Sequence, residues 1–320
     1  MRLSTLWTSL TASVFDIWNL CIRALFDEAI ESLNIDKSKI ILDGTAGGGG
    51  HSREIAKRAG RLIAVDQDPD AIKVLHERLV SFDNVTIVQN NFSNVKDILK
   101  EQGIEKIDGM LLDLGVSSFQ LDTAQRGFSY HADAPLDMRM SKSGLSAKDV
   151  VNTYSEAELA DILFRYGEEK FARRIAKNIV LHRQNKEIET TGELVDIIKE
   201  SYPKAKMRDS HPARKTFQAI RIEVNAELDA LEKTLDSALD CLSSGGRLSI
   251  ITFHSLEDRM VKEKFNSWVN PCTCPKEFPV CVCGKKPLGK MPFKFKAPSE
   301  AELDENPRAR SSKLRCFEKF

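Results

Sequence analysis

A run of glycines after an acidic residue offers the first candidate chemistry in this sequence. Gly47–Gly50 follows Asp43, and a helix-like segment begins at His51. Serial glycines accept positive φ angles and let a ligand approach the backbone, while the free N–H groups of a following helix attract anions. A second acid, Asp66, ends the next apolar run, where a carboxylate can accept both hydroxyl groups of a ribose. The pattern predicts a site for a nucleotide-like cofactor.

The glycine spacing bears on which cofactor this is. A dinucleotide site closes its G-x-G-x-x-G turn with Gly or Ala, but that position is Ser52 when counted from Gly47 and Arg53 when counted from Gly48. The spacing therefore disfavours an NAD-dependent oxidoreductase, which stays as an alternative. S-adenosylmethionine also presents a ribose and suits the same pair of acids, Asp43 and Asp66.

Composition limits the class of protein. The 320 residues carry 47 basic and 47 acidic side chains, so any surface that binds nucleic acid must be local. Seven cysteines without a convincing secretory signal indicate a reducing compartment, and we expect a cytoplasmic protein. Charged and polar residues interrupt the apolar N-terminal segment, so we expect no membrane partner.

The elements that must position these residues follow from the hydrophobic pattern. Strand-like and helix-like segments alternate through the first part of the chain, which predicts an α/β fold with a doubly wound, mostly parallel sheet of the Rossmann-like kind. The expected strands cover 40–43, 61–66, 85–89 and 107–113, and the expected helices 51–59, 69–80 and 94–101. Ligands bind at the carboxyl ends of such strands, where Asp43, Asp66, Phe92 and Asp113 stand.

The rhythm then changes to helices alone. Capping boxes at Ser155–Glu158 and Thr190–Glu193 predict two helix starts. We expect a helical insertion over 122–212, a sheet domain made of 26–121 and 213–320, and an atypical N-terminal extension over 1–25. In the second part of the sheet domain, we expect one long helix over 215–242, a strand over 247–253 and an edge strand over 313–317. A buried amphipathic helix is expected over 3–26, with an organellar transit peptide or an incorrectly assigned start codon as the alternatives.

Seven segments together resemble one family, the ribosomal RNA small-subunit methyltransferases H, also called MraW. The matching segments are Asp43–Ser52, Asp108–Ser118, Gln125–Ser129, Pro135–Met140, His211–Asn225, Ile251–Arg259 and Asn306–Ser312. The resemblance runs in order from about residue 26 to the C-terminus. It implies a class I methyltransferase fold and S-adenosylmethionine-dependent methylation of the exocyclic N4 of a cytidine in 16S rRNA.

The resemblance also implies a set of cofactor contacts. Asp66 would hold the ribose and Phe92 would lie beside the adenine; the other contacts would be Gly49, Gly50, His51, Asp113 and Gln120. Asp113 is placed on the cofactor side, although it could also accept from the cytosine amine. His254 is the second catalytic candidate and could contact RNA, act as a base or cap the following helix. No catalytic role is assigned beyond these two candidates.

The expected partner is 16S rRNA within the small ribosomal subunit or its precursor, with a homodimer as a further possibility. Clustered basic residues are candidates for phosphate contacts, and the helical insertion is a candidate for RNA recognition. These basic residues are Lys204, Lys206, Arg208, Arg214, Lys215, Lys285, Lys286, Lys290, Arg308, Arg310 and Lys313. A DNA amino-methyltransferase and a non-catalytic assembly factor that binds cofactor and RNA are the alternatives.

Three features depart from the expected pattern or stay open. The family's His-x-Pro-Val-Leu segment aligns with Cys21–Leu25, and Phe119 replaces a usual proline, where it could stack on a base or pack in the loop. Four cysteines could form a zinc site, although C-x-C spacing is tighter than the usual C-x-x-C. They are Cys272, Cys274, Cys281 and Cys283. We assign no metal here, and zinc stays as the alternative.

Overall fold

A computed structural model describes residues 24–203, 211–275, 280 and 282–320. The expected N-terminal helix over 3–26 therefore lies largely outside the described residues, as do Lys204, Lys206, Arg208 and Cys281. Within the described residues, no helix is both long and apolar enough to cross a membrane.

A seven-stranded sheet in the described part of the chain has the order β3-β2-β1-β4-β5-β7-β6. Strands β1 to β5 run parallel, whereas β7 pairs antiparallel with β5 and β6 pairs antiparallel with β7. The strands are β1 Ile40–Asp43, β2 Arg61–Asp66, β3 Val85–Gln89, β4 Ile107–Asp113, β5 Leu242–Thr252, β6 Gly289–Lys290 and β7 Lys313–Lys319. The first four strands coincide with the predicted ranges, and the predicted fold class is confirmed.

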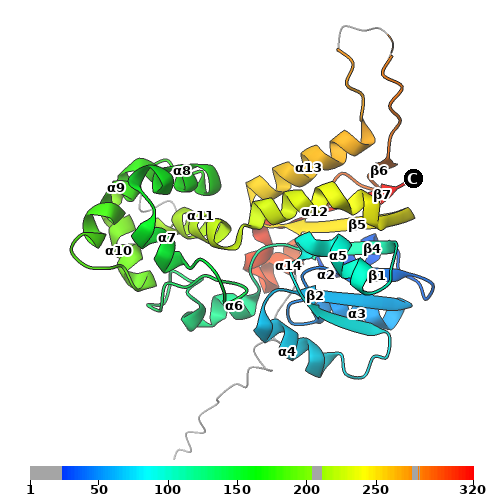
Figure 1. The fold of residues 1–320 in the computed structure, drawn as a ribbon, viewed down its shortest axis with the longest axis horizontal. Coiled ribbons are helices and arrows are strands. Elements are labelled where there is room, and N and C mark those ends of the chain that lie inside the picture. The colour runs from blue at the N-terminus through cyan, green and yellow to red at the C-terminus, as the bar shows by residue number, and fades with distance from the viewer. Residues whose placement is uncertain (1–23, 204–210, 276–279, 281) are drawn as a thin grey trace, which may run out of the picture.

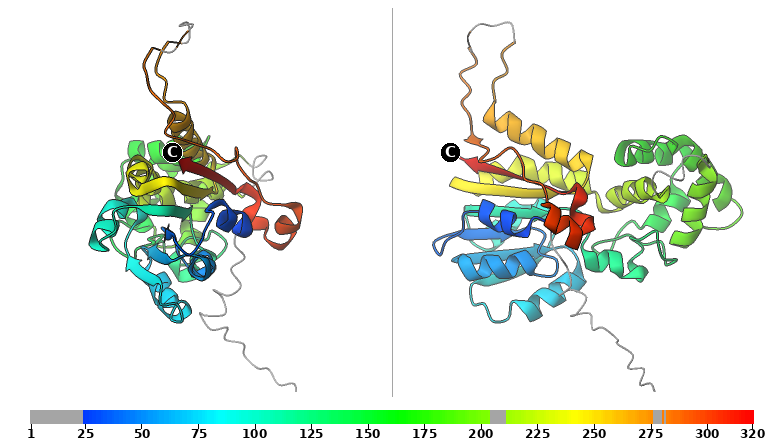
Figure 2. Two further views of the ribbon diagram at one scale, coloured as in Figure 1. Left: turned by 90° about the vertical axis from the view of Figure 1, so that its right-hand side faces the viewer. Right: turned by 180° about the vertical axis from the view of Figure 1, so that it is seen from behind.

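Alternate residues of the strands face two different cores, because side chains in a strand point to opposite faces. In β4, Met110 and Leu112 pack with the core that contains α5, α12 and α13, while Leu111 packs with the core that contains α2 and α3. Helices therefore cover both faces of the sheet (Figures 1 and 2). The helices of this part are α2 Phe26–Ser32, α3 Gly50–Arg58, α4 Pro69–Arg78, α5 Val95–Glu101, α12 Glu227–Cys241, α13 Ser255–Val269 and α14 Glu300–Glu305.

A group of helices with its own apolar core lies beyond one end of the sheet, on the side away from the C-terminus (Figure 2). The predicted capping boxes at Ser155 and Thr190 are confirmed, and they open α8 and α10. The helices are α6 Ser118–Asp122, α7 Ala147–Thr153, α8 Glu156–Gly167, α9 Ala172–Arg183, α10 Thr191–Ser201 and α11 Ala213–Asn225. Helix α11 contributes Phe217 and Ile220 to this core, although the sequence grouped residues from 213 onward with the sheet.

The long helix expected over 215–242 was wrong. The chain forms α11 and α12 instead, and Ala226 between them has a left-handed backbone with φ 47°. Both segments have helical apolar periodicity, so the pattern alone did not reveal the break. The break turns α12 onto the sheet while α11 stays with the helical core, as Figure 1 shows.

The strand predicted over 313–317 is confirmed as β7, Lys313–Lys319. On its outer side, β6 pairs with Glu318 and Lys319, beyond the predicted range, and a single bridge joins Lys296 to Leu314. The strand expected over 247–253 begins earlier, at Leu242, and ends at Thr252.

Candidate active site

A cavity of about 690 Å³ opens at the carboxyl ends of β1, β2 and β4. The glycine turn and the strand ends form its inner wall. Its outer wall comes from the helical part, the start of α12, the end of β5 and the segment before β7. The inner wall includes Gly47, Gly48, Gly50, His51, Asp66, Phe92, Asp113 and Gln120; the outer wall includes Tyr130, Met140, Arg214, Arg221, Asn225, Glu227, Phe253 and Arg310. Segments far apart in the sequence thus share one cavity.

Asp43 holds the glycine turn in place from below. Its carboxylate is fully buried and accepts from the Ser52 hydroxyl at 2.6 Å and from the Thr45 amide at 3.3 Å. The turn is therefore tied to the first turn of α3. Asp43 therefore has a structural role, because its carboxylate oxygens accept hydrogen bonds from donors of the protein itself.

Gly49 differs from Gly50, the other glycine predicted to contact the cofactor. It does not line the cavity, and a Cβ added to it would meet Leu75 of α4 at 3.1 Å. Its φ of 77° is a left-handed conformation that favours glycine, and it precedes the first residue of α3. The geometry gives Gly49 a conformational reason to be glycine, while Gly50 lines the cavity.

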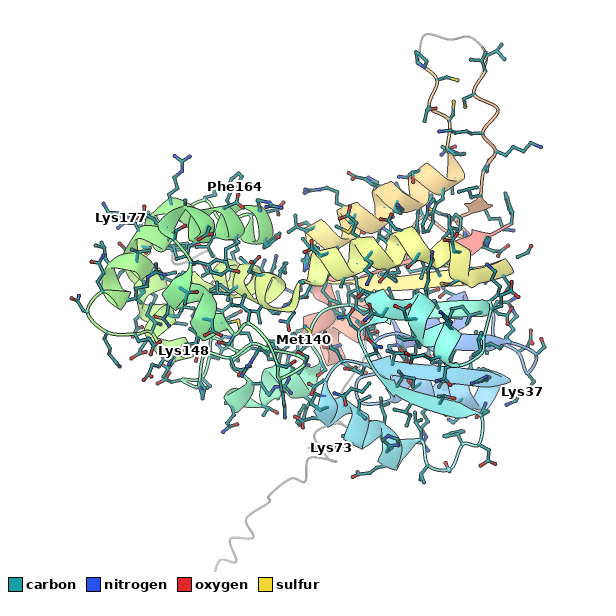
Figure 3. The ribbon with its side chains drawn as sticks, viewed as in Figure 1. Lys37, Lys73, Met140, Lys148, Phe164 and Lys177 are labelled. Atoms are coloured by element: carbon teal, nitrogen blue, oxygen red, sulfur yellow. The ribbon has the colours of Figure 1, made fainter. Side chains whose placement is uncertain are left out.

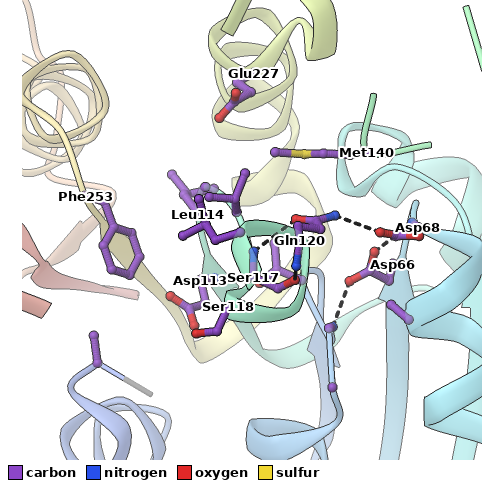
Figure 4. Close-up of a pocket in the computed structure, with 18 of the residues that line it drawn as sticks. Asp66, Asp68, Asp113, Leu114, Ser117, Ser118, Gln120, Met140, Glu227 and Phe253 are labelled. Carbon is purple, nitrogen blue, oxygen red and sulfur yellow. Dashed lines mark hydrogen bonds between the residues drawn. The ribbon is translucent and has the colours of Figure 1, made fainter. Parts of the chain in front are cut away.

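Asp66 stands at the end of β2 with both carboxylate oxygens held by backbone amides. The Gly47 amide donates to Oδ2 at 2.7 Å and the Asp68 amide donates to Oδ1 at 2.8 Å. Burial raises the pKa of Asp66 to about 6, although these two hydrogen bonds act in the opposite direction. The carboxylate is thus fixed in orientation and faces the cavity that it lines (Figure 4).

Phe92 follows β3 and begins a short 3₁₀ helix, Phe92–Asn94, whose preceding residue Asn91 accepts from the Ser93 amide. Its ring is partly buried against the core beneath α5 and α12, and it also lines the cavity. Gly44 packs closely against Phe92, because a Cβ added to Gly44 would lie 3.0 Å from the Phe92 Cβ. Phe92 therefore gives the cavity an apolar face beside a polar strand end.

Asp113 ends β4 close to the glycine turn. Its backbone amide donates to the Thr45 hydroxyl at 2.6 Å, and its Oδ2 lies 3.8 Å from Nδ1 of His51. The His51 ring is 5% exposed and lies against Phe26, with ring centroids 5.1 Å apart. Asp113 and His51 are thus neighbours on the glycine-turn side of the cavity.

Gln120 belongs to a buried network whose other members the sequence did not indicate. Its Nε2 donates to Oδ2 of Asp68 at 2.8 Å, and Nη1 of Arg126 donates to the same oxygen at 2.8 Å. Ser117 and Gln120 form a capping box at the start of α6. Arg126 lies in one of the segments that resemble the family, and Asp68 precedes Pro69, as an N-terminal helix cap would. Neither feature predicted the contact between Asp68 and Arg126.

His254 caps α13. Its Nδ1 accepts from the Glu257 amide at 3.4 Å and its Nε2 lies 3.1 Å from Glu257 Oε1. Burial of Glu257 disfavours its charge, but the hydrogen bonds from His254 and the Phe253 amide and the charge of Arg221 together lower the pKa of Glu257. Of the three roles considered for His254, this geometry matches the helix cap.

The outer wall is organised around Asn225 and Arg221. Nδ2 of Asn225 donates to the Met138 carbonyl and its Oδ1 accepts from the Met140 amide, both at 2.8 Å. Arg221 forms two hydrogen bonds with Glu227, at 2.8 and 2.9 Å, across the break between α11 and α12. Figure 4 shows Met140, Glu227 and Phe253 around the space above Asp113 and Asp66.

The candidate phosphate contacts divide into three groups. Arg214, Arg308 and Arg310 are exposed at the cavity mouth, and Arg308 also pairs with Asp122. Three others contact acceptors of the protein itself: Lys215 donates to the Glu168 carbonyl, Lys290 pairs with Glu318 and Lys313 pairs with Asp258. Lys285 and Lys286 are exposed on the extension between α13 and β6.

Phe119 is buried against Ala71 and Val74, so it packs within the protein.

A sheet of order 3-2-1-4-5-7-6 with an antiparallel seventh strand, and a glycine-turn cavity at the carboxyl strand ends, define a class I methyltransferase. The chain belongs to the MraW methylase family, which it matches over residues 21–320. It is 58% identical over 303 residues to a ribosomal RNA small subunit methyltransferase H 2 of Agathobacter rectalis, covering 92% of this chain and 96% of that protein. It is 56% identical over 303 residues to a ribosomal RNA small subunit methyltransferase H of Lachnospira eligens, with the same coverage.

The matches among solved structures are much more distant in sequence. An rRNA methylase from Streptococcus thermophilus is 12% identical with a TM-score of 0.40, covering 92% of this chain and 93% of that one. The N-methyltransferase NodS from Bradyrhizobium japonicum, in complex with S-adenosyl-l-homocysteine, is 7% identical with a TM-score of 0.41, covering 97% and 90%.

Proposed function

We propose that this protein transfers the methyl group of S-adenosylmethionine to the exocyclic N4 of a cytidine in 16S rRNA. The observation that carries the proposal is the continuity of the cavity from the glycine turn to Tyr130, Met140 and Arg214 on the helical part. A methyl donor at one wall and a base at the other would meet within it. The names of the relatives, ribosomal RNA small subunit methyltransferase H, support the substrate class.

The residues of the inner wall suit S-adenosylmethionine chemically. Asp66 offers fixed carboxylate oxygens to ribose hydroxyls, and Phe92 offers an apolar face to adenine. Gly50 and His51 open α3 beside the cavity, and Gln120 completes that wall. We propose that Asp113 holds the ammonium group of the methionine part, because it lies beside the glycine turn and next to His51. When bound, the cofactor supplies an electrophilic methyl group.

The acceptor requires positioning rather than covalent activation. A cytosine amine is conjugated with its ring and is a weak nucleophile, so the protein must align its lone pair with the sulfur–methyl bond. Met140 and Phe253 on the outer wall can exclude water from the base, and the Asn225 hydrogen bonds hold the Met138–Met140 segment in place. In a direct in-line transfer the nitrogen–methyl bond forms as the sulfur–methyl bond breaks, S-adenosylhomocysteine leaves and the amine gives up one proton. No covalent cysteine adduct is needed, because the amine itself is the nucleophile.

The RNA would approach the cavity mouth between the helical part and the segment before β7. Arg214 of α11 and Arg310 of the 3₁₀ helix Pro307–Ser311 both line the cavity and are exposed. Arginine forms paired hydrogen bonds with phosphate, so two such residues can fix the backbone of a strand whose base enters the cavity. We therefore propose that residues 122–212 serve with α11 as the RNA-recognition part.

Nucleoside mass spectrometry tests this function. Small subunits purified from cells that lack the gene are incubated with the protein and with S-adenosylmethionine carrying a heavy methyl group, and the rRNA is then digested. We expect heavy N4-methylcytidine from wild type and none from Asp66→Ala. A heavy methyl on another base, or incorporation into DNA instead, would overturn the proposal. An Asp113→Ala chain that methylates nothing but restores growth would favour an assembly factor.

A further inference from the structure

The long extension between α13 and β6 has little structure to hold it. Residues 270–288 contain no helix or strand among those described, and the extension projects from the body as two arms (Figure 1). Val280 and Val282 are 70% and 71% exposed, so the arms are not held by an apolar core. Long irregular segments of this kind are uncommon unless something other than a core stabilises them.

Hydrogen bonds fasten the base of the extension to the body. The Leu288 amide donates to the Trp268 carbonyl at 2.9 Å, and the Phe320 amide donates to the Leu288 carbonyl at 3.0 Å. Farther out, the two arms meet at cysteines. The Val282 amide donates to Sγ of Cys274 at 3.3 Å, and Sγ of Cys283 lies 3.8 Å from Sγ of Cys272.

Three thiols of the described residues converge at this place. The sulfur atoms of Cys272, Cys274 and Cys283 all lie within 4.8 Å of one another. Two thiolates at Zn–S distances of about 2.3 Å in a tetrahedral site stand about 3.8 Å apart, and the Cys272–Cys283 separation of 3.8 Å agrees with this. A disulfide would need the two sulfur atoms at about 2.05 Å.

We propose that Cys272, Cys274 and Cys283 bind a structural zinc ion that clips the two arms of the extension together. On binding, each thiol releases its proton and donates a sulfur lone pair to the metal, and no electron is transferred. The Val282 amide hydrogen bond to Cys274 would support the thiolate from outside the metal shell. Lys285 and Lys286 follow Cys283 and are exposed, so they can offset the negative charge of several thiolates around one Zn²⁺.

The fold favours a zinc site more strongly than the cysteine spacing does. C-x-C spacing by itself left zinc as the weaker alternative, whereas the fold brings thiols from both arms to bonding separation. The fourth ligand is left open, because Cys281 lies outside the described residues. The zinc clip would hold Lys285 and Lys286 in a fixed position relative to the body. This proposal is independent of the proposed methyl transfer.

Metal analysis of the full chain tests the proposal without reference to activity. The protein is purified under reducing conditions, stripped with a chelator and titrated with zinc chloride against a chromophoric competitor. We expect about one zinc per chain, and with cobalt(II) an intense thiolate-to-metal charge-transfer band. The Cys272→Ser/Cys274→Ser/Cys283→Ser variant should lose the bound zinc and the cobalt charge-transfer band. Cys241→Ala, which removes a thiol buried in the core between the sheet and α12, should keep the zinc and the band.

Proteolysis supplies a second readout. Zinc should protect residues 270–288 of wild type from a protease several-fold and should not protect the triple variant. The thermal unfolding of the body should be similar in both, because the extension lies outside the three large cores. If the triple variant fails to fold, Cys274→Ser alone serves for the same titration. Zinc binding equal in wild type and the cysteine variants, or no cobalt charge-transfer band in wild type, would overturn the proposal.

Discussion

Asp68 and Arg126 form a buried ion pair, with 2.8 Å between Oδ2 and Nη1 and side chains that are only 2% and 8% exposed. Asp68 also caps α4, and Arg126 donates through Nη2 to the carbonyls of Arg139 and Met140. The pair therefore joins the loop after β2 to the segment that leads into the helical part. It connects the inner wall of the cavity to its outer wall.

Removing one partner of this pair should be costly. Arg126→Met leaves the Asp68 carboxylate buried without its cation, and we expect a loss of about 3–5 kcal/mol in the free energy of unfolding. The double variant Asp68→Asn/Arg126→Met should lose less free energy of unfolding than the sum of the losses in the two single variants, because no uncompensated charge remains. Urea unfolding measures this.

Arg165→Met is the matched control for that series. Its partner is Asp161, and both side chains are more than half exposed, so the change should stay within about 0.5 kcal/mol. Strictly additive losses at Asp68 and Arg126 would contradict the proposed coupling between them.

Cofactor binding should depend on the ionisation of Asp66. Because burial raises the pKa of Asp66 to about 6, the carboxyl gains its proton at a higher pH than its ordinary 3.8. A ribose hydroxyl prefers the ionised acceptor, so the affinity for S-adenosylhomocysteine should be full above pH 7 and fall as the pH drops through 6, by at most about tenfold per pH unit. Calorimetry at pH 5 to 7.5 measures this, and an equally steep decline in Asp66→Asn would assign it to another group.

The same shift has the opposite sign for the stability of the ligand-free protein. A carboxyl whose folded pKa is raised favours folding when it is protonated. Asp66 should therefore contribute most below pH 3.8, and its contribution should be lost as the pH rises through 6. In a comparison with Asp66→Asn by urea unfolding, the stability difference between the two proteins should change across this interval.

Gly44→Ala should distort the cavity wall through a steric clash with Leu112 and Phe92. The added Cβ would lie 2.6 Å from Leu112 Cδ2 and 3.0 Å from Phe92 Cβ, so one of these neighbours must move. We expect a loss of about 1–3 kcal/mol in stability and a weaker affinity for S-adenosylhomocysteine, because Phe92 belongs to its proposed wall. Gly103→Ala is the control: no atom lies within 4 Å of its added Cβ, although its φ of 65° also introduces strain. Lost stability with unchanged affinity in Gly44→Ala would separate Phe92 from the cofactor.

Arg214→Ala and Arg310→Ala should weaken RNA binding through lost phosphate contacts. Each change should lower the magnitude of the slope of log K against log salt by about 1, and should do so for unrelated RNA sequences as well. Fluorescence anisotropy over a salt series measures the slope. Lys37→Ala is the control, because Lys37 lies at the far end of the sheet from the helical part (Figure 3). An equal effect at Lys37 would show that any surface cation suffices.

The sequence determined the elements that depend on local pattern. The alternation of apolar runs and the glycine turn predicted the first four strands, and the sequence set Asp66, Phe92 and Asp113 at the carboxyl ends of parallel strands, which one sheet brings to one edge. The capping boxes at Ser155 and Thr190 were equally readable, because each is an interaction between residues three apart.

Only the tertiary structure decided what depends on contacts distant in sequence. The break at Ala226 has no local signal, since it arises where α11 and α12 pack on different cores. Asp68 and Arg126 are 58 positions apart, and Cys272 and Cys283 are neighbours in space although they are 11 positions apart. Period and spacing report on neighbours along the chain, whereas ion pairs and metal ligands are defined by separation in space.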